Sequence, residues 1–169
     1  MSWPNKLYVA TKTLGVYYTS DFSDPNTQPT WAAVNGGLPT TDVRQFALDP
    51  FNPAGKQYLL LETARTLYRR DNGGNWASIL TSAAVATLVE CSGLIHWFCT
   101  DETIAGRLWI VFVENIGNNS GLWGLYSDDY GETWNKPTKA ASHQLDYTNW
   151  SDGIKAQGNT VYIHEVTQS

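Results

Sequence analysis

The chain has 169 residues, a formal net charge of −5 at pH 7 and a sequence pI near 5.0. No block of Lys or Arg residues occurs along it, and this argues against nucleic acid or an anionic membrane as the main partner, because both attract clustered positive charge. No run approaches the roughly 18 apolar residues of a membrane span, and the N-terminal segment lacks a signal-peptide core. We therefore predict no membrane insertion, and either a cytoplasmic location or an export signal outside this sequence.

Short segments that alternate apolar and polar residues follow one another along the chain and are typical of half-buried strands. They predict strands near residues 6–12, 15–20, 30–34, 42–48, 57–63, 66–70, 75–80, 85–91, 94–100, 107–114, 121–127, 133–136, 152–157 and 160–166. The strands of region 82–116 are hard to assign, because three of its segments could form strands where two would suffice. No helical periodicity stands out along the chain. Polar loops at 101–106, 115–120 and 137–151 are the expected functional loops.

A short motif recurs three times. Its most regular copy runs from Ser127 to Trp134, a second copy spans residues 68–76, and a third spans 18–31 with five inserted residues. The residues assigned to the motif are Asp21 and Trp31, then Asp71, Gly73 and Trp76, and finally Ser127, Asp129, Gly131, Thr133 and Trp134. The Asp positions are separated by 50 residues (71 − 21) and 58 residues (129 − 71), a period that suits one four-stranded propeller blade with its loops.

Each residue type in the motif has a role in closing a hairpin between two antiparallel strands. The Asp carboxylate can accept hydrogen bonds from backbone N–H groups of the turn, and the Ser or Thr hydroxyl offers another local bond. Gly supplies a backbone angle that a side chain disfavours. Trp returns its ring to the apolar layer of the sheet. The motif is therefore predicted to be structural.

The pattern Ser-x-Asp-x-Gly-x-Thr-Trp at residues 127–134 resembles the Asp-box, or BNR, repeat of sialidase-like β-propellers. The run from Gly15 to Thr63, with "VNGGLP" after the first motif Trp and "VRQFALDPFNP" beyond it, resembles the repeat unit of bacterial propellers in this group. Related proteins include sialidases, xyloglucan-degrading glycosidases, photosystem-assembly-factor-like proteins and sortilin-type receptors. The resemblance implies an all-β fold of four-stranded antiparallel blades, with the motifs on outer hairpins away from the ligand face.

The strands are too few for a closed ring. Residues 1–169 are predicted to form one domain of about three to three and a half blades, whereas propellers typically have about four to eight. Unpaired strand edges would remain, and such edges invite further pairing. We expect completion either by a homo-oligomer, most simply a dimer, or by sequence missing from this chain.

A catalytic site is not evident from the sequence. A sialidase of this resemblance would need an arginine triad, an Arg-Ile-Pro motif and a Tyr/Glu pair, but no Arg-Ile-Pro occurs. The arginines are Arg44, Arg65, Arg69, Arg70 and Arg107. Other glycosidases need two carboxyl groups about 5–9.5 Å apart. The available acids are Asp42, Glu62, Asp101, Glu102, Glu114, Asp146 and Asp152, and nothing in the sequence pairs any two. Part of a glycoside hydrolase remains the alternative function.

Metal and thiol chemistry have little support. His96, His143 and His164 are far apart and have no Cys at ligand spacing, so no metal and no cofactor are predicted. His96 is expected to be a packed strand residue. If residues 92–94 turn a hairpin, Cys91 and Cys99 do not face each other at disulfide distance, and both are expected to be buried free thiols.

A non-catalytic binding or scaffold module fits more of these features. Aromatic rings stack on the apolar faces of sugars, and an acidic, Trp-rich surface suits neutral glycans. Five Trp residues are predicted to lie in blade cores: Trp31, Trp76, Trp97, Trp109 and Trp134. The remaining aromatic candidates for a ligand platform are Trp3, Trp123, Tyr130, Tyr147 and Trp150. The predicted partner is a carbohydrate or a protein.

Overall fold

The computed structural model describes residues 6–22, 26–52, 55–71, 73–89, 94–114, 121–135, 138–141 and 150–165. These residues form an all-β protein with thirteen strands and one helix. They lie in four antiparallel sheets, and within each sheet the strands follow one another in chain order. No helix in the described part is long and apolar enough to cross a membrane.

The first two sheets come from the N-terminal half of the chain. The first sheet contains β1 (Leu7–Thr11), β2 (Gly15–Thr19) and β3 (Ala32–Ala33). The second sheet contains β4 (Val43–Leu48), β5 (Lys56–Leu61), β6 (Leu67–Asp71) and β7 (Trp76–Leu80).

The C-terminal half begins with a helix and forms the other two sheets. Helix α1 (Ser82–Val89) leads from the second sheet into the third. The third sheet contains β8 (Ile95–Thr100), β9 (Leu108–Glu114), β10 (Gly121–Ser127) and β11 (Thr138–Ala141). The fourth sheet is the hairpin of β12 (Trp150–Gln157) and β13 (Thr160–Glu165).

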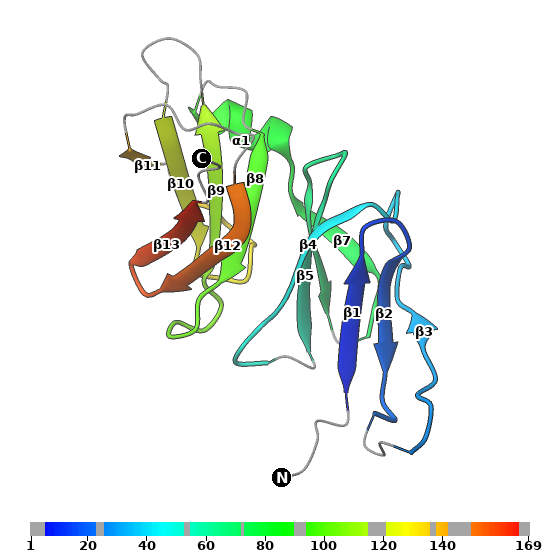
Figure 1. Ribbon diagram of the computed structural model, residues 1–169. Coiled ribbons are helices and arrows are strands. Elements are labelled where there is room, and N and C mark those ends of the chain that lie inside the picture. The colour runs from blue at the N-terminus through cyan, green and yellow to red at the C-terminus, as the bar shows by residue number, and fades with distance from the viewer. Residues whose placement is uncertain are drawn as a thin grey trace.

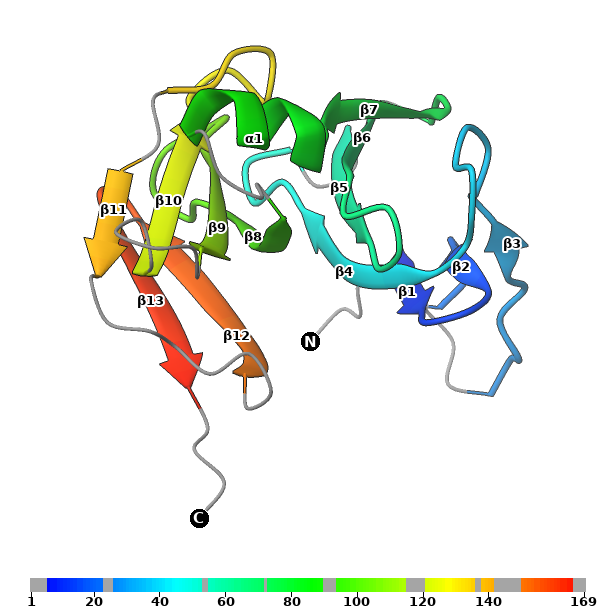
Figure 2. The same ribbon diagram turned by 90° about the horizontal axis from the view of Figure 1, so that it is seen from above.

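The sheets follow one another along an open arc, with the first sheet at one end and the fourth at the other (Figure 1). The principal contacts between neighbouring sheets join their first strands, namely β1 with β4, β4 with β8, and β8 with β12. Seen from above, these four strands lie on the inner side of the arc, whereas the last strand of each sheet lies on its outer side (Figure 2).

Apolar side chains fill the spaces between the sheets. On β5, Tyr58 and Leu60 belong to the cluster shared with the third sheet, while Leu59 and Leu61 belong to the cluster shared with the first sheet. Successive side chains of a strand point to opposite faces, so β5 is buried on both sides. A smaller cluster around Trp97 and Val111 joins the third sheet to the fourth. Each sheet is therefore held by packing against its neighbour.

The predicted strand at 85–91 is wrong, because residues 82–89 form α1. The hydroxyl of Thr81 accepts a hydrogen bond from the Ala84 backbone N–H at 3.1 Å, as an N-capping residue does. Three alanines favour the helix, and Val85 anchors it in the core with no exposed surface. The Val and Thr residues of this segment produced the strand prediction. Cys91 and the turn expected at 92–94 fall outside the described residues, except for Leu94, whereas Cys99 is a buried free thiol.

The strand predicted at 133–136 is also misplaced. Residues 131–135 still belong to the turn, and the last strand of the third sheet is β11. The turn is extended by Asn135, whose side chain accepts a hydrogen bond from the Tyr126 N–H and whose own N–H donates to the Tyr126 carbonyl at 2.9 Å. These local bonds use the backbone groups that a strand starting at residue 133 would need.

Candidate functional site

The three sequence motifs lie on the hairpins between the last two strands of the first, second and third sheets. In the third sheet, Asp129 accepts hydrogen bonds from the Thr133 N–H at 2.8 Å, the Thr133 hydroxyl at 2.6 Å and the Ser127 hydroxyl at 2.7 Å. The Ser127 hydroxyl in turn accepts one from the Gly131 N–H at 2.8 Å. The bonds from Thr133 and Ser127 lower the pKa of Asp129 to about 2. The turn is a closed hydrogen-bond network.

The first motif repeats part of this network. Asp21 accepts the Thr30 N–H at 3.1 Å, and its other close partner is the hydroxyl of Thr19. Thr19 and Ser127 occupy the same place, two residues before the Asp. The prediction that the Asp carboxylate accepts backbone N–H groups of the turn is thus confirmed at Asp21 and Asp129.

The second motif departs from the expectation. The described partners of the Asp71 carboxylate are two cations, Lys56 at 2.9 Å and Arg69 at 2.8 Å. Arg69 takes the place of Ser127 and also reaches the third motif, where it donates to the Tyr130 carbonyl at 2.9 Å and pairs with Glu132 at 2.7 Å. Here the turn is closed by the Gly74 N–H, which donates to the Asp71 carbonyl at 2.8 Å, and by Arg70, which donates to the Gly74 carbonyl at 2.8 Å, while Arg69 links the second sheet to the third.

The two motif glycines adopt the backbone conformation that was predicted for them. Gly73 and Gly131 have φ angles of 81° and 90°, in the region that disfavours a side chain. At Gly131 a Cβ atom would also stand 2.6 Å from the terminal methyl group of Ile79, which would have to move.

The motif Trp residues do not all lie in the core. Trp76 is buried and donates its Nε1–H to the Val34 carbonyl at 2.6 Å, and Trp134 packs partly buried against the main core cluster. Trp31 is 38% exposed, which contradicts its predicted core position. It ends the long first motif and precedes β3, a strand of only two residues at the open end of the arc, so little structure covers it.

The predicted aromatic platform is not assembled by the residues that the structure describes. Trp123 stacks on Phe112 with the ring centroids 6.4 Å apart and packs against the core. Tyr130 lies in the third motif, where the Lys56 amine sits 4.7 Å from its ring centroid. Tyr147 and Trp3 fall outside the described residues, and Trp150 is placed only as the first residue of β12.

The loop at 101–106, predicted to be functional, is held by local hydrogen bonds. The buried Asp101 accepts the backbone N–H groups of Thr103 at 2.7 Å and Ile104 at 2.9 Å. Burial favours a higher pKa for Asp101, but the bonds from Thr103 outweigh it and lower the pKa. Nearby, Arg107 donates to the Gly158 carbonyl at 3.2 Å and fastens the β12–β13 hairpin. The other two expected loops fall largely outside the described residues.

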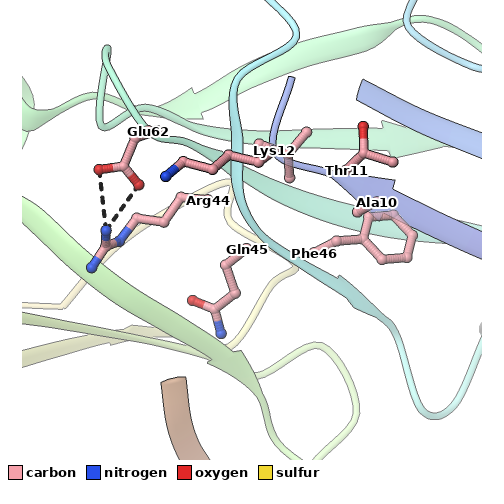
Figure 3. Close-up of a pocket in the computed structure, with 8 residues that line it drawn as sticks. Ala10, Thr11, Lys12, Arg44, Gln45, Phe46 and Glu62 are labelled. Atoms are coloured by element: carbon pink, nitrogen blue, oxygen red, sulfur yellow. Dashed lines mark hydrogen bonds and ion pairs between the residues drawn. The ribbon is translucent and has the colours of Figure 1, made fainter. Parts of the chain in front are cut away.

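A pocket of about 600 Å³ opens instead between β1 and β4, on the inner side of the arc (Figure 3). It is lined by the end of β1, the first part of β4 and one residue that follows β5: Ala10, Thr11, Lys12, Val43, Arg44, Gln45, Phe46 and Glu62. The sequence prediction named Arg44 and Glu62 only as members of larger sets, and it did not single out Lys12 or Phe46. The lining residues share one feature: each lies on or next to the first strand of its sheet, or directly after the strand beside it.

The pocket holds one carboxylate that forms ion pairs and one lysine that forms none with the described residues. Glu62 binds the Nη1 atom of Arg44 at 2.9 Å and the Nη2 atom of Arg65 at 2.9 Å. Burial favours a raised pKa for Glu62, but the hydrogen bond and charge of Arg44 outweigh it, so the pKa is lowered. Lys12 is exposed and has no ion-pair partner among the described residues. The charge of Lys12 also acts on Glu62, so three cations surround one carboxylate and the pocket carries a net positive charge.

The wall behind the pocket is bonded to β8. Arg44 donates its Nε–H to the His96 carbonyl at 2.8 Å and stacks over the Trp97 ring at 5.5 Å. The Gln45 amide donates to the Phe98 carbonyl at 2.6 Å and accepts the Phe98 N–H at 3.0 Å. These side chains of β4 bond to β8, the Thr11 hydroxyl bonds within its own turn and Phe46 packs against Tyr8 and Trp76, which leaves Lys12 as the charged group of the pocket with no hydrogen bond or ion pair to the described residues.

Within the described residues, no cluster of three or more His, Cys, Asp or Glu residues is arranged to hold a metal ion. His96 is 7% exposed and packs in β8, as predicted. In comparisons with known proteins, no family model matches the chain and no curated protein matches its sequence.

Proposed function

We propose that this chain is a non-catalytic binding module of β-propeller architecture, and that its ligand binds on the inner side of the arc in the pocket between β1 and β4. The supporting observation is the charge arrangement of that pocket: Glu62 is held by two arginines, while Lys12 is left without an ion-pair partner among the described residues. A carbohydrate or a segment of a protein is the ligand class proposed, since hydroxyl, ammonium and aromatic groups lie together there.

The arrangement of the sheets supports the propeller interpretation. Each sheet is a meander in chain order, and the first strands contact one another along the inner side of the arc. The Asp-containing hairpins join the last two strands, on the outer side, as expected for Asp-box repeats (Figure 2). In this proposal each sheet is one blade or part of one, and the motifs stabilise the blades without touching the ligand.

A glycoside hydrolase is less well supported. Such an enzyme needs two carboxyl groups across the scissile bond, one of them with a raised pKa so that it stays protonated. Glu62 and the nearby Asp42 both have lowered pKa values: burial opposes the shift in each, Arg44 overcomes it at Glu62, and hydrogen bonds from Thr40 and Thr63 overcome it at Asp42. Neither is suited to donate a proton to a leaving group.

A glycan array with the purified chain tests the proposal. We expect a saturable hit that Lys12→Ala weakens and Lys6→Ala leaves unchanged, because Lys6 is an equally exposed lysine that does not line the pocket. Silence across neutral and acidic glycans would count against a carbohydrate ligand. Turnover of aryl glycosides or xyloglucan would restore the hydrolase.

The open arc also requires further sheets to close a ring. We propose that they come from a second copy of the chain in a dimer, or from the remainder of a longer propeller. Light scattering over a concentration series separates the two sources. A stable mass at twice 18.8 kDa supports the dimer, and a monomer at all concentrations supports the longer propeller.

A further inference from the structure

The pocket between β1 and β4 has a charged end and an apolar end. Figure 3 shows the Lys12 amine, Glu62 and Arg44 together at one end. Ala10 and Phe46 line the other end. The chain as a whole carries a formal net charge of −5, so this local excess of positive charge is opposite in sign to the charge of the whole molecule.

The hydrogen-bond acceptors of the pocket are already occupied. The Glu62 carboxylate accepts bonds at 2.9 Å and 3.2 Å from Arg44 and at 2.9 Å from Arg65. The amide of Gln45 bonds to β8, and the hydroxyl of Thr11 bonds within its own turn. These side chains therefore offer little capacity to accept a hydrogen bond from a ligand hydroxyl.

The hydrogen-bond donors of the pocket are not all occupied. Among the described residues, the Lys12 ammonium forms no hydrogen bond or ion pair, and the Nη2 atom of Arg44 has no hydrogen-bond partner. Lys12 is exposed, and the Arg44 side chain is 21% exposed. The nearby carboxylate of Asp42 does not line the pocket. Charged donors without matching acceptors favour a ligand group that only accepts, as a carboxylate does, over a sugar hydroxyl, which must also donate.

The size of the pocket and its apolar end indicate what carries the carboxylate. A volume of about 600 Å³ is that of a site for a small molecule or for a few sugar units. The planar carboxylate group matches the fork of the Arg44 guanidinium, and the ring of Phe46 offers an apolar surface to a sugar ring. A uronic acid combines both features, whereas the sequence alone favoured neutral glycans because the whole chain is acidic.

We propose that the pocket binds an acidic sugar, a uronic acid whose carboxylate meets Lys12 and Arg44 while its ring packs against Phe46. This inference rests on the proposed function and narrows its carbohydrate ligand to an anionic one. In this arrangement Glu62 orients Arg44 and offsets part of its charge, and it makes no bond to the sugar. The observation that carries the inference is the set of unpartnered cationic donors beside acceptors that are already bonded.

Isothermal titration calorimetry with matched sugars tests the proposal. The probes are trisaccharides of galacturonate, glucuronate and mannuronate, each compared with its methyl ester, which keeps the ring and removes the charge. At least one acid should bind about fivefold more tightly than its ester, the size expected for a partly exposed ion pair. The preference should shrink at high salt, because the charge of the exposed Lys12 is then screened.

Two variants should change the affinity for the acid in opposite directions. Lys12→Gln should lower it to that of the ester, whereas Lys6→Gln, which removes a charge outside the pocket, should leave it unchanged. Glu62→Gln should raise it about threefold, because the charge of Arg44 is no longer offset. A site that held a neutral sugar through Glu62 would lose affinity in the same variant. A thermal melt checks that each variant is folded.

Equal affinity for every acid and its ester, or weaker acid binding by a folded Glu62→Gln variant, would overturn the proposal. A neutral glycan from the array that remains sensitive to Lys12→Ala would then still stand, so the proposed function would survive the loss of this inference. A sulfated trisaccharide or an acidic peptide that binds through Lys12 more tightly than any uronate would overturn the assignment to a sugar carboxylate.

Discussion

Asp129 illustrates how single residues hold the hairpins of this fold. Its carboxylate satisfies the Thr133 N–H and two hydroxyl groups of the same turn, and the Ser127 hydroxyl satisfies the Gly131 N–H. All of these groups lie within seven residues of one another, so the local sequence is sufficient to predict the turn. The local sequence is not sufficient at Asp71, because one of its two cationic partners, Lys56, comes from the neighbouring strand β5.

Replacement of Asp129 by Ala should lower the free energy of unfolding by about 1–2 kcal/mol, because the turn loses an acceptor for several donors. Ligand affinity should be unchanged, since the hairpin lies on the outer side of the arc. Urea denaturation and the binding assay measure the two effects. Asp128→Ala is the control and should cost less, because its ion pair with Arg107 is half-exposed. Weakened binding at unchanged stability would refute the structural role of Asp129.

His96 makes stability depend on pH. Burial first, and then the charges of Arg65 and Arg44, lower its pKa to about 4, from an ordinary value of 6.5. Between pH 6.5 and 4, His96 is therefore protonated in the unfolded chain but neutral in the folded chain. The free energy of unfolding should fall as the pH drops from about 6.5 to 4. Denaturant melts at pH 7.5, 6 and 5 should show a smaller loss in His96→Asn. Equal losses in both proteins would exclude His96 as the cause.

The first strands of the second and third sheets, β4 and β8, are linked by hydrogen bonds from side chains to the backbone and not by backbone-to-backbone pairing. Arg44, Gln45 and Thr100 bond to backbone groups of the opposite strand across the β4–β8 boundary. Both strands also carry an irregularity at the equivalent residue, with register shifts between Val43 and Gln45 and between Ile95 and Trp97. A bulge re-aims side chains, and at Arg44 it accompanies a side chain that spans to the next sheet.

Gln45→Met keeps the size of the side chain and removes its amide. We expect a loss of about 1–3 kcal/mol in the free energy of unfolding, because the Phe98 N–H and carbonyl lose their partner at a part-buried position. Gln157→Met serves as the control, since Gln157 is exposed in the β12–β13 hairpin. Equal stability of the two variants would contradict the role assigned to Gln45. Chemical denaturation at pH 7 is the measurement.

The strands were largely predictable because alternation of apolar and polar residues reports one buried face of a sheet. Helix α1 was not, because its Val and Thr residues favour strands and only its cap at Thr81 and its alanines favour a helix. The pocket could not be predicted either. Lys12, Arg44 and Glu62 are brought together by packing between the first two sheets, and a single sequence does not reveal which strand edges meet.

The whole molecule is an arc whose two ends differ. Within the described residues, the first sheet consists of the three strands β1–β3 and the fourth sheet of the hairpin β12–β13. The contacts along the inner side, from β1 through β4 and β8 to β12, give the arc a continuous inner face. A pocket on that face, with one lysine left without an ion pair among the described residues, is where further chains or ligands would meet the module.

The most direct test of the proposed binding site is hydrogen–deuterium exchange across the chain, with and without the strongest array glycan at saturation. Slower exchange is predicted in β1 and in the first part of β4, around residues 10–12 and 43–46, with the hairpins at 68–76 and 126–134 unchanged. Protection confined to the outer hairpins, or spread over the outer strands β7 and β11, would contradict the inner face as the binding site.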